Sequence, residues 1–230
     1  MRLGIIGAQG KMGKQIISLA LQDTSIEFTL PLNTREKLQA KDTPSLDVII
    51  DFSTKEALKE NLILAQAKSC PIVIGTTGFE KEEIELLREA SKKIPIFQAP
   101  NFSLGMAATL YVSKILSSLL QGFTSRIEET HHTQKKDAPS GSALALKTAI
   151  EKGNPHSTPS ITSFRVGDVI GEHKVFFTSQ EEDIILSHQA TSRAVFAKGA
   201  LTAAKFLVSQ KPGLYDMDDL LPYLLENHPS

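Results

Sequence analysis

The chain has 230 residues, of which 41% are hydrophobic and 22% are charged, and its formal net charge is −1. These values are ordinary for a globular protein and exclude a disordered or fibrous chain. The near-zero charge, with basic residues scattered along the sequence, argues against a nucleic-acid partner or an anionic membrane surface.

A single cysteine, Cys70, excludes an internal disulfide and a thiolate metal cage. It precedes Pro71 beside an apolar run, and we interpret it as a small buried hydrophobic residue. No signal peptide opens the sequence, and no stretch approaches the ~20 apolar residues of a membrane span. We therefore expect a cytoplasmic protein with no membrane partner.

Short apolar runs alternate with helical patterns in the first hundred residues. Strands are predicted at 3–6, 26–30, 47–52, 71–75 and 94–98. Ser53 and Glu56 have the spacing of a capping box for the helix after the third strand. Unbroken Val/Ile runs with helices between them are typical of a parallel sheet covered on both faces. We expect an α/β, Rossmann-type dinucleotide-binding domain.

The pattern changes near Asn101. A helix is predicted at 105–121 and another at 143–151, and extended segments are predicted at 124–131, 161–166, 174–178 and 183–188. This order indicates a smaller α+β domain with an antiparallel or mixed sheet. A helix near 199–209 and the tail at 215–225 could return to the first domain. The predicted division gives residues 1–101 and 196–230 to the dinucleotide-binding domain and residues 102–195 to the second domain.

A glycine-rich loop joins the first strand to the first helix. It reads Gly7-Ala8-Gln9-Gly10-Lys11-Met12-Gly13. The first glycine allows a tight turn, the second lets backbone approach a pyrophosphate, and the third lets the helix press on the strand. The spacing is looser than G-x-G-x-x-G, so a plain turn is the alternative. Its place between a strand and an amphipathic helix favours dinucleotide binding at the helix N-terminus.

The end of the second predicted strand is where an acidic residue would hold the adenosine ribose. No acid follows that strand directly, and Arg35 comes soon after it. An arginine there suits a 2′-phosphate, which favours NADPH over NADH. The alternative is that Arg35 is a solvated loop cation.

The most informative segment runs from residue 128 to residue 142 and contains His131, His132 and Lys135, followed by Ser140-Gly141-Ser142 at the start of a helix. Adjacent histidines without a matching carboxylate or cysteine cluster make a poor metal cage, so no metal is expected. A polar loop capped by Ser140 is the alternative to a catalytic segment.

This segment resembles the E-x-H-H-x-x-K-x-D-A-P-S-G-[TS]-A signature of the dihydrodipicolinate reductase family. Further stretches that resemble the family are Lys11-Met12, 75–78, 99–105, 165–173 and 213–217. The resemblance runs along nearly the whole chain. Two departures from the family concern cofactor choice. The stretch from Arg35 to Ser45 is shorter than in better-known members, and the acidic residue that helps select NADH, expected directly at the strand end, is absent.

The resemblance implies an oxidoreductase that uses NADPH or NADH to reduce a small cyclic dicarboxylate with a C=N unit. This substrate derives from 4-hydroxy-tetrahydrodipicolinate, and the product is tetrahydrodipicolinate of lysine and diaminopimelate biosynthesis. It places His131 and Lys135 at the proposed acid positions. Histidine titrates near neutrality and a desolvated lysine has a lowered pKa, so both remain candidate proton donors.

The resemblance also implies the binding residues and the assembly. His132, Gly141 and Ser142 would grip the substrate, and Arg193 would either contact a carboxylate or form a structural salt bridge. The cofactor would contact the glycine loop, Arg35, Gly75, Thr76, Thr77, Ala99, Pro100, Asn101 and Phe102. The second domain would assemble a homotetramer.

Two other functions are compatible with part of the sequence. A related two-domain enzyme, such as an aspartate or homoserine dehydrogenase, would explain the glycine loop but not the segment from His131 to Ser142. A non-catalytic dinucleotide sensor would need the glycine loop alone.

Overall fold

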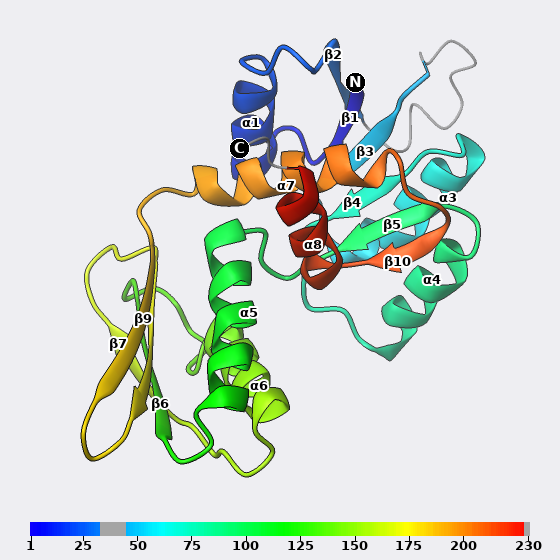
Figure 1. The fold of residues 1–230 in the computed structure, drawn as a ribbon. Coiled ribbons are helices and arrows are strands. Elements are labelled where there is room, and N and C mark those ends of the chain that lie inside the picture. Colours follow the sequence, from blue (N-terminus) through cyan, green and yellow to red (C-terminus); the bar gives the residue numbers. More distant parts are fainter. Residues whose placement is uncertain (33–44, 228–230) are drawn as a thin grey trace. The chain divides into compact units, whose positions relative to one another are not determined.

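A computed structural model describes residues 1–32 and 45–227 (Figure 1). The chain divides into two compact units, one made of Met1–Phe102 with Ala194–Ser230 and the other of Ser103–Arg193. The predicted boundaries, after residues 101 and 195, lie close to these. Among the described residues, no helix is both long and apolar enough to cross a membrane.

The first unit is built on a six-stranded sheet with the order β10-β5-β4-β3-β1-β2. Every pairing in this sheet is parallel. The strands are β1 Arg2–Ile6, β2 Phe28–Leu32, β3 Val48–Asp51, β4 Ile72–Ile74, β5 Pro95–Gln98 and β10 Gly213–Tyr215. The predicted Rossmann-type parallel sheet is therefore confirmed.

Helices cover both faces of this sheet, as the unbroken Val/Ile runs predict. They are α1 Lys11–Ala20, α3 Leu58–Ala67, α4 Lys81–Ser91, α7 Ala194–Leu207 and α8 Met217–Asn227. On one face, Ile49 and Ile72 pack in a fully apolar core with Leu62 of α3 and Leu87 of α4. On the other face α7 crosses β3, β4 and β5 and contacts α1 (Figure 1).

The predicted capping box at Ser53 and Glu56 is wrong. A short 3-10 turn, Lys55–Ala57, begins the helical segment, and its N-cap residue is Thr54. The Ser53 hydroxyl instead accepts a hydrogen bond from the Asn61 amide at 3.1 Å. A tertiary contact has replaced the local cap.

The C-terminal segment contributes more to the first unit than its sequence pattern indicates. Residues 213–215, of which only Tyr215 belonged to the predicted tail, form the edge strand β10. Leu214 of β10 pairs in parallel register with Ile96 of β5. A strand of three residues carries too little periodicity to be recognised in sequence.

The second unit is a four-stranded sheet with the order β7-β6-β8-β9. Its strands are β6 Thr124–His131, β7 Ser160–Arg165, β8 Gly171–Thr178 and β9 Asp183–Ala190. β6 and β7 are parallel, while the other two pairings are antiparallel, so the predicted mixed sheet is confirmed.

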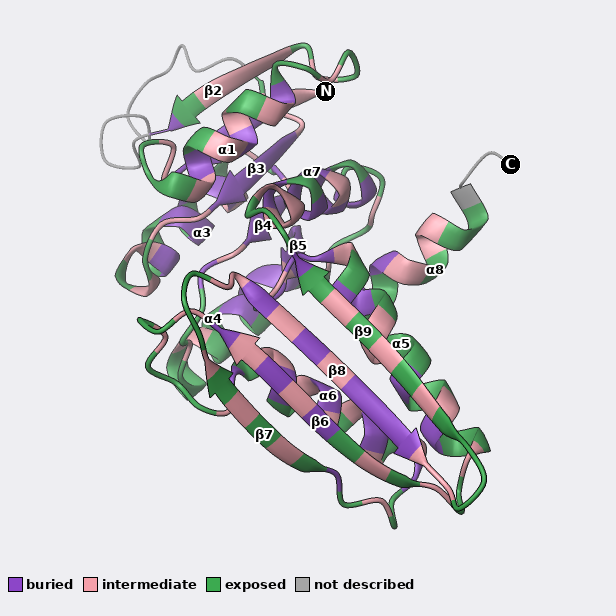
Figure 2. Cartoon of the chain, turned by 90° about the vertical axis from the view of Figure 1, so that its left-hand side faces the viewer, coloured by how far each residue is buried: buried purple, intermediate pink, exposed green. Residues whose placement is uncertain are grey.

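Two helices, α5 Leu104–Leu119 and α6 Gly141–Gly153, lie behind this sheet in Figure 2. Met106 of α5 and Leu146 of α6 form a buried core with Ile127, Val175 and Phe177 of the strands. Residues alternate between this core and the opposite face along each strand. The helices therefore cover only one face of the sheet within this unit.

Candidate functional site

The glycine loop after β1 is shaped by close backbone contacts. Gly7 has a φ of +77°, and a Cβ there would lie 2.5 Å from the Phe52 carbonyl oxygen. A Cβ at Gly13 would lie 2.3 Å from the Gly7 carbonyl oxygen, so α1 packs directly on the loop. Only glycine fits these two positions without a shift of the backbone.

The N-terminus of α1 lies at this loop. Its N-cap is Gly10, and no acidic residue occupies the first turn. The positive end of the helix dipole is therefore uncompensated by an acidic side chain of its own first turn. Gln9, Gly10 and Lys11 are exposed, whereas Ala8 and Met12 are half-buried.

The other predicted cofactor residues follow β4 and β5, at the same edge of the parallel sheet. Thr76 is buried, and its hydroxyl has no hydrogen-bond partner among the described residues. Gly75 is half-buried and Thr77 is exposed. An unpartnered buried hydroxyl is costly unless a ligand satisfies it.

The loop after β5 is anchored by its aromatic residue. Ala99 and Phe102 are buried, Asn101 is half-buried and Pro100 is exposed. The Phe102 ring lies 5.5 Å from the Phe52 ring, which follows β3.

These observations fit a dinucleotide. The exposed Gly10 presents backbone without a side chain, the α1 N-terminus suits phosphates, and the Thr76 hydroxyl needs a partner. Arg35, the predicted contact to a 2′-phosphate, lies outside the described residues.

Asp51 is a buried acid at the end of β3 that sequence reasoning missed. Its carboxylate accepts hydrogen bonds from the Ser53 backbone N–H at 2.9 Å and from the Asn61 amide at 2.7 Å. Burial raises its pKa, and the hydrogen bonds offset part of that effect. The acid thereby holds the turn that contacts Gly7. The signal in the sequence was an acidic residue, Asp51, at the end of the apolar run 48–50.

Strand register places a polar cluster at one end of the covered face of the second sheet. His131 is opposite Arg165 on β7, and Glu129 is opposite His173 on β8. His173 is opposite His188 on β9. Both helices begin at this end, since their N-cap residues bond to the same cluster: Ser103 to His188 and Ser140 to His173.

Glu129 is at the centre of the cluster and is 1% exposed. One carboxylate oxygen is hydrogen-bonded to Nδ1 of His131. The other lies 3.0 Å from the Arg165 guanidinium and accepts a bond from the Ser140 backbone N–H at 3.3 Å. Burial acts to raise the Glu129 pKa, but hydrogen bonds from Ser163, Arg165 and His131 outweigh it and lower that pKa below its ordinary value.

The two buried histidines favour their neutral forms. Burial lowers the pKa of His131, and the positive charges of Lys135 and Arg165 add to this, while Glu129 opposes it. Burial, with His131 beside it, lowers the pKa of His173 to about 4. The two rings meet edge to face with centroids 5.1 Å apart. At neutral pH His173 is therefore an uncharged imidazole.

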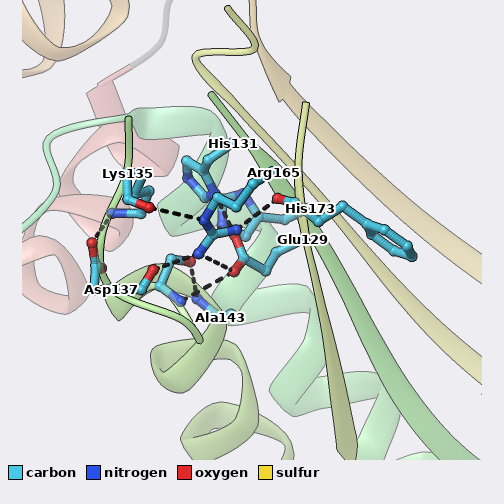
Figure 3. A network of polar contacts seen from close by, with 9 residues as sticks. Glu129, His131, Lys135, Asp137, Ala143, Arg165 and His173 are labelled. Atoms are coloured by element: carbon cyan, nitrogen blue, oxygen red, sulfur yellow. Dashed lines mark hydrogen bonds and ion pairs between the residues drawn. The ribbon is translucent and has the colours of Figure 1, made fainter. Parts of the chain in front are cut away.

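Lys135 lies on the loop after β6. Its ammonium is 2.8 Å from the Asp137 carboxylate. The Lys135 backbone carbonyl accepts a bond from Arg165 Nε at 3.3 Å, and the Asp137 carbonyl accepts another from the same guanidinium. Figure 3 shows Arg165 between the Glu129 carboxylate and this loop. Arg165 thus bonds directly to the Lys135 backbone and is linked to His131 through Glu129.

The predicted substrate-binding residues lie on either side of this loop. His132 is half-buried, and its Nδ1 atom is buried without a hydrogen-bond partner in the described part of the chain. Gly141 and Ser142 form the first turn of α6, which holds no acidic residue. This helix begins two residues before the predicted start at residue 143. Arg193 is exposed.

One possible ligand set was not anticipated from sequence. Glu129, His131 and His173 offer atoms within 4.8 Å of one another, the spacing of a metal site. The Glu129 carboxylate, however, already pairs with Arg165, whose positive charge opposes a second cation there. We assign no metal to this cluster.

Comparison with known proteins covers both units. Residues 1–102 match the family model described as dihydrodipicolinate reductase, N-terminus, and residues 105–221 match its C-terminus counterpart. The chain is 42% identical over 221 residues to the 4-hydroxy-tetrahydrodipicolinate reductase of Bdellovibrio bacteriovorus, with 96% of each chain covered.

A second relative and a solved structure that resemble this chain over nearly its whole length also carry reductase names. The 4-hydroxy-tetrahydrodipicolinate reductase of Caldanaerobacter subterraneus subsp. tengcongensis is 40% identical over 246 aligned positions, which cover 96% of this chain and 98% of the relative. The dipicolinate-bound dihydrodipicolinate reductase from Paenisporosarcina sp. TG-14 superposes with a TM-score of 0.78 at 21% identity. That match covers 94% of this chain and 97% of the solved one.

Proposed function

The chain belongs to the dihydrodipicolinate reductase family, and from this premise we propose that it reduces 4-hydroxy-tetrahydrodipicolinate to tetrahydrodipicolinate, with release of water, using a nicotinamide dinucleotide. This reaction is a step of lysine and diaminopimelate biosynthesis, and we expect the enzyme in the cytoplasm. The observation that carries the proposal is the polar cluster in which Arg165 is linked to His131 through Glu129 and to the Lys135 backbone directly. An amino-acid dehydrogenase or a dinucleotide sensor would not require this cluster.

The bound nicotinamide supplies the hydride of this reduction. The protein must supply one proton to the substrate ring, and Lys135 is our candidate donor. The pKa of His131 is lowered by burial, and its Nδ1 atom is committed to Glu129. The Lys135 ammonium is partly exposed, lies 2.8 Å from the Asp137 carboxylate and carries a proton that it can donate to the substrate.

We propose that His132, Gly141 and Ser142 bind the substrate carboxylates. The buried Nδ1 atom of His132 has no hydrogen-bond partner among the described residues, and a substrate oxygen would provide one. The first turn of α6 provides a positive helix end without an acidic residue to neutralise it. Arg193 is exposed and is a candidate contact to the second carboxylate.

We propose that the glycine loop and the turns after β4 and β5 bind the cofactor. The residues are Gly7, Ala8, Gln9, Gly10, Lys11, Met12, Gly13, Gly75, Thr76, Thr77, Ala99, Pro100, Asn101 and Phe102. NADPH is the proposed preference, with Arg35 as the contact to its 2′-phosphate. Arg35→Ala is then expected to weaken the binding of NADPH but not that of NADH. An equal loss of affinity for both cofactors would contradict this role.

We propose that the second unit assembles a homotetramer through the sheet face opposite α5 and α6. Phe164 is 45% exposed and Ile185 is 55% exposed on this face. Phe176 lies there too, with the Arg126 guanidinium 3.5 Å from its ring centre. Exposed aromatic and aliphatic side chains on an uncovered sheet face are typical of subunit contacts. Light scattering after gel filtration tests the assembly, and a monomer would contradict it.

The reductase proposal is tested with purified protein, NADPH or NADH, and the freshly formed product of dihydrodipicolinate synthase. We expect oxidation of the reduced cofactor, followed by its absorbance, only when the synthase product is present. Absence of oxidation above background with both cofactors would overturn the proposal.

A further inference from the structure

Arg165 bonds both to Glu129 on β6 and to the backbone of the loop that holds Lys135. Its guanidinium lies 3.0 Å from the Glu129 carboxylate on β6. Its Nε atom donates to the Lys135 carbonyl at 3.3 Å, and another nitrogen donates to the Asp137 carbonyl. A further bond reaches the Phe164 carbonyl at 2.7 Å. The planar guanidinium has the donor geometry for such a set, which a lysine ammonium cannot reproduce.

The opposite side of the Glu129 carboxylate holds His131. An ionised carboxylate only accepts hydrogen bonds, so the hydrogen in this contact resides on Nδ1 of His131. In the neutral imidazole, Nε2 then carries the lone pair. A Cβ on Gly171 would lie 3.1 Å from Nε2, so the missing side chain there leaves room beside this atom.

We propose that Glu129 and Arg165 are positioning residues for the reductase reaction. Glu129 fixes the orientation and tautomer of His131, and Arg165 fixes the Glu129 carboxylate and the Lys135 loop in one geometry (Figure 3). The inference rests on the proposed function, because it gives the cluster a role in that catalysis. Neither residue needs to touch the substrate.

The charges that face His131 come from several elements. Glu129 is on the same strand, Arg165 is on β7, Lys135 is on the following loop, and the neutral His173 is on β8. Asp137 faces Lys135 rather than His131. The carboxylate of Glu129 is therefore the only negative charge among these groups that directly contacts the imidazole.

This arrangement gives a positioning role a signature that a purely structural role lacks. If Glu129 becomes an amide and the fold persists, His131 loses its negative partner but keeps Arg165 and Lys135, so its pKa falls further. If the cluster instead opens to water, the pKa of His131 rises toward the ordinary value of 6.5. The sign of the change separates the two cases.

The first experiment compares Glu129→Gln with wild type and with the control Glu151→Gln, which removes a half-buried carboxylate of α6 that pairs with Lys147 at 3.8 Å. We expect kcat to fall about 10- to 100-fold in Glu129→Gln, with KM for the cofactor unchanged, because misplacement of a reacting group acts on the chemical step. Hydrogen–deuterium exchange at the histidine ring carbon, read by mass spectrometry against pH, gives the pKa of His131. We expect it to be lower than in wild type.

The second experiment uses Arg165→Lys, with Arg88→Lys on α4 as its control. The charge is kept and the multiple contacts are lost, so we expect the His131 pKa to change little while kcat falls about tenfold or more. If Glu129→Gln does not fold, Glu129→Asp replaces it, since it retains the charge and shortens the reach to His131.

A kcat within about twofold of wild type in the folded Glu129 and Arg165 variants would overturn the inference. A raised or unchanged His131 pKa in Glu129→Gln would also overturn it. The histidine exchange needs no substrate, so it tests the electrostatic role of Glu129 even if wild type proves inactive. An inactive wild type would contradict the proposed function itself.

Discussion

The two units present polar chemistry in different ways. In the first unit, the candidate cofactor site is formed mainly by backbone groups: the Gly7 turn, the N-terminus of α1 and the ends of parallel strands. In the second, side chains from three strands gather at Glu129, and the backbone of the loop after β6 bonds to one of them, Arg165. A backbone site depends on which side chains are missing, whereas a side-chain site depends on which are present and on strand register. The two should therefore fail in different ways.

The largest expected effect is on catalysis in the second unit. Lys135→Ala removes the proposed acid, and we expect kcat to fall by about 10²–10⁴ with KM for the cofactor nearly unchanged. Lys136→Ala, at an exposed neighbouring position, is the control. Steady-state kinetics measure both, and full kcat in Lys135→Ala would remove this residue from the donor role.

The side-chain cluster should also make stability depend on pH. The His173 pKa is about 4 in the folded protein and 6.5 ordinarily, so the unfolded chain binds the proton first as pH falls. Stability is fully present above pH 6.5 and is lost toward pH 4, by up to about 3 kcal/mol from this residue. His131 and His188, with pKa values lowered by burial, act in the same direction.

Urea unfolding at several pH values measures this dependence. His173→Gln should flatten the curve between pH 6.5 and 4.5, whereas His156→Gln, at an exposed position, should leave it as in wild type. An unaltered slope in His173→Gln would assign the acid sensitivity to other groups.

The backbone site should fail through stability and cofactor affinity together. Gly7→Ala forces a side chain into a positive φ and against the Phe52 carbonyl, and we expect a loss of about 1–3 kcal/mol with weaker cofactor binding. Gly167 has a φ of +46°, and a Cβ added there would meet nothing within 4 Å. Gly167→Ala therefore isolates the conformational cost of a side chain at positive φ. Thermal unfolding and cofactor titration measure the pair. Equal losses in both variants would mean that the Phe52 contact is unimportant.

The smallest effect tests whether a missing side chain matters in the second unit as well. Gly171→Ala narrows the space beside His131 Nε2 to 3.1 Å. We expect kcat to fall about tenfold with little change in thermal stability. Gly122→Ala, where a Cβ meets nothing within 4 Å, is the control. Unchanged kcat in Gly171→Ala would show that Nε2 needs no such space.

The same contrast explains what the sequence could predict. The parallel sheet follows from local Val/Ile runs, and the glycine loop follows from its place between a strand and a helix. The edge strand β10 was not predicted, because three residues are too few to show a hydrophobic periodicity. The capping box at Ser53 was wrong because Asn61, eight residues away, bonds to that hydroxyl.

The second unit shows where sequence reasoning stops. His131 and Lys135 were selected by their motif, but Glu129, Arg165 and His173 were not assigned roles. Their convergence depends on strand pairing across more than thirty residues, since Glu129 is opposite His173 and His131 is opposite Arg165. No local pattern encodes that register. Glu129 two residues before His131 was the one nearby signal.

The first unit is assembled from both ends of the chain. Its β10 edge strand and its α7 cover come from residues 194–215, after the whole of the second unit. During synthesis, β5 stays unpaired on one side, and the part of the sheet face that α7 covers stays exposed, until residues 194–215 leave the ribosome. The second unit, continuous in sequence, can complete its own sheet meanwhile. A truncation shortly before residue 194 would therefore leave the sheet of the first unit open to aggregation, although most of its residues would be present.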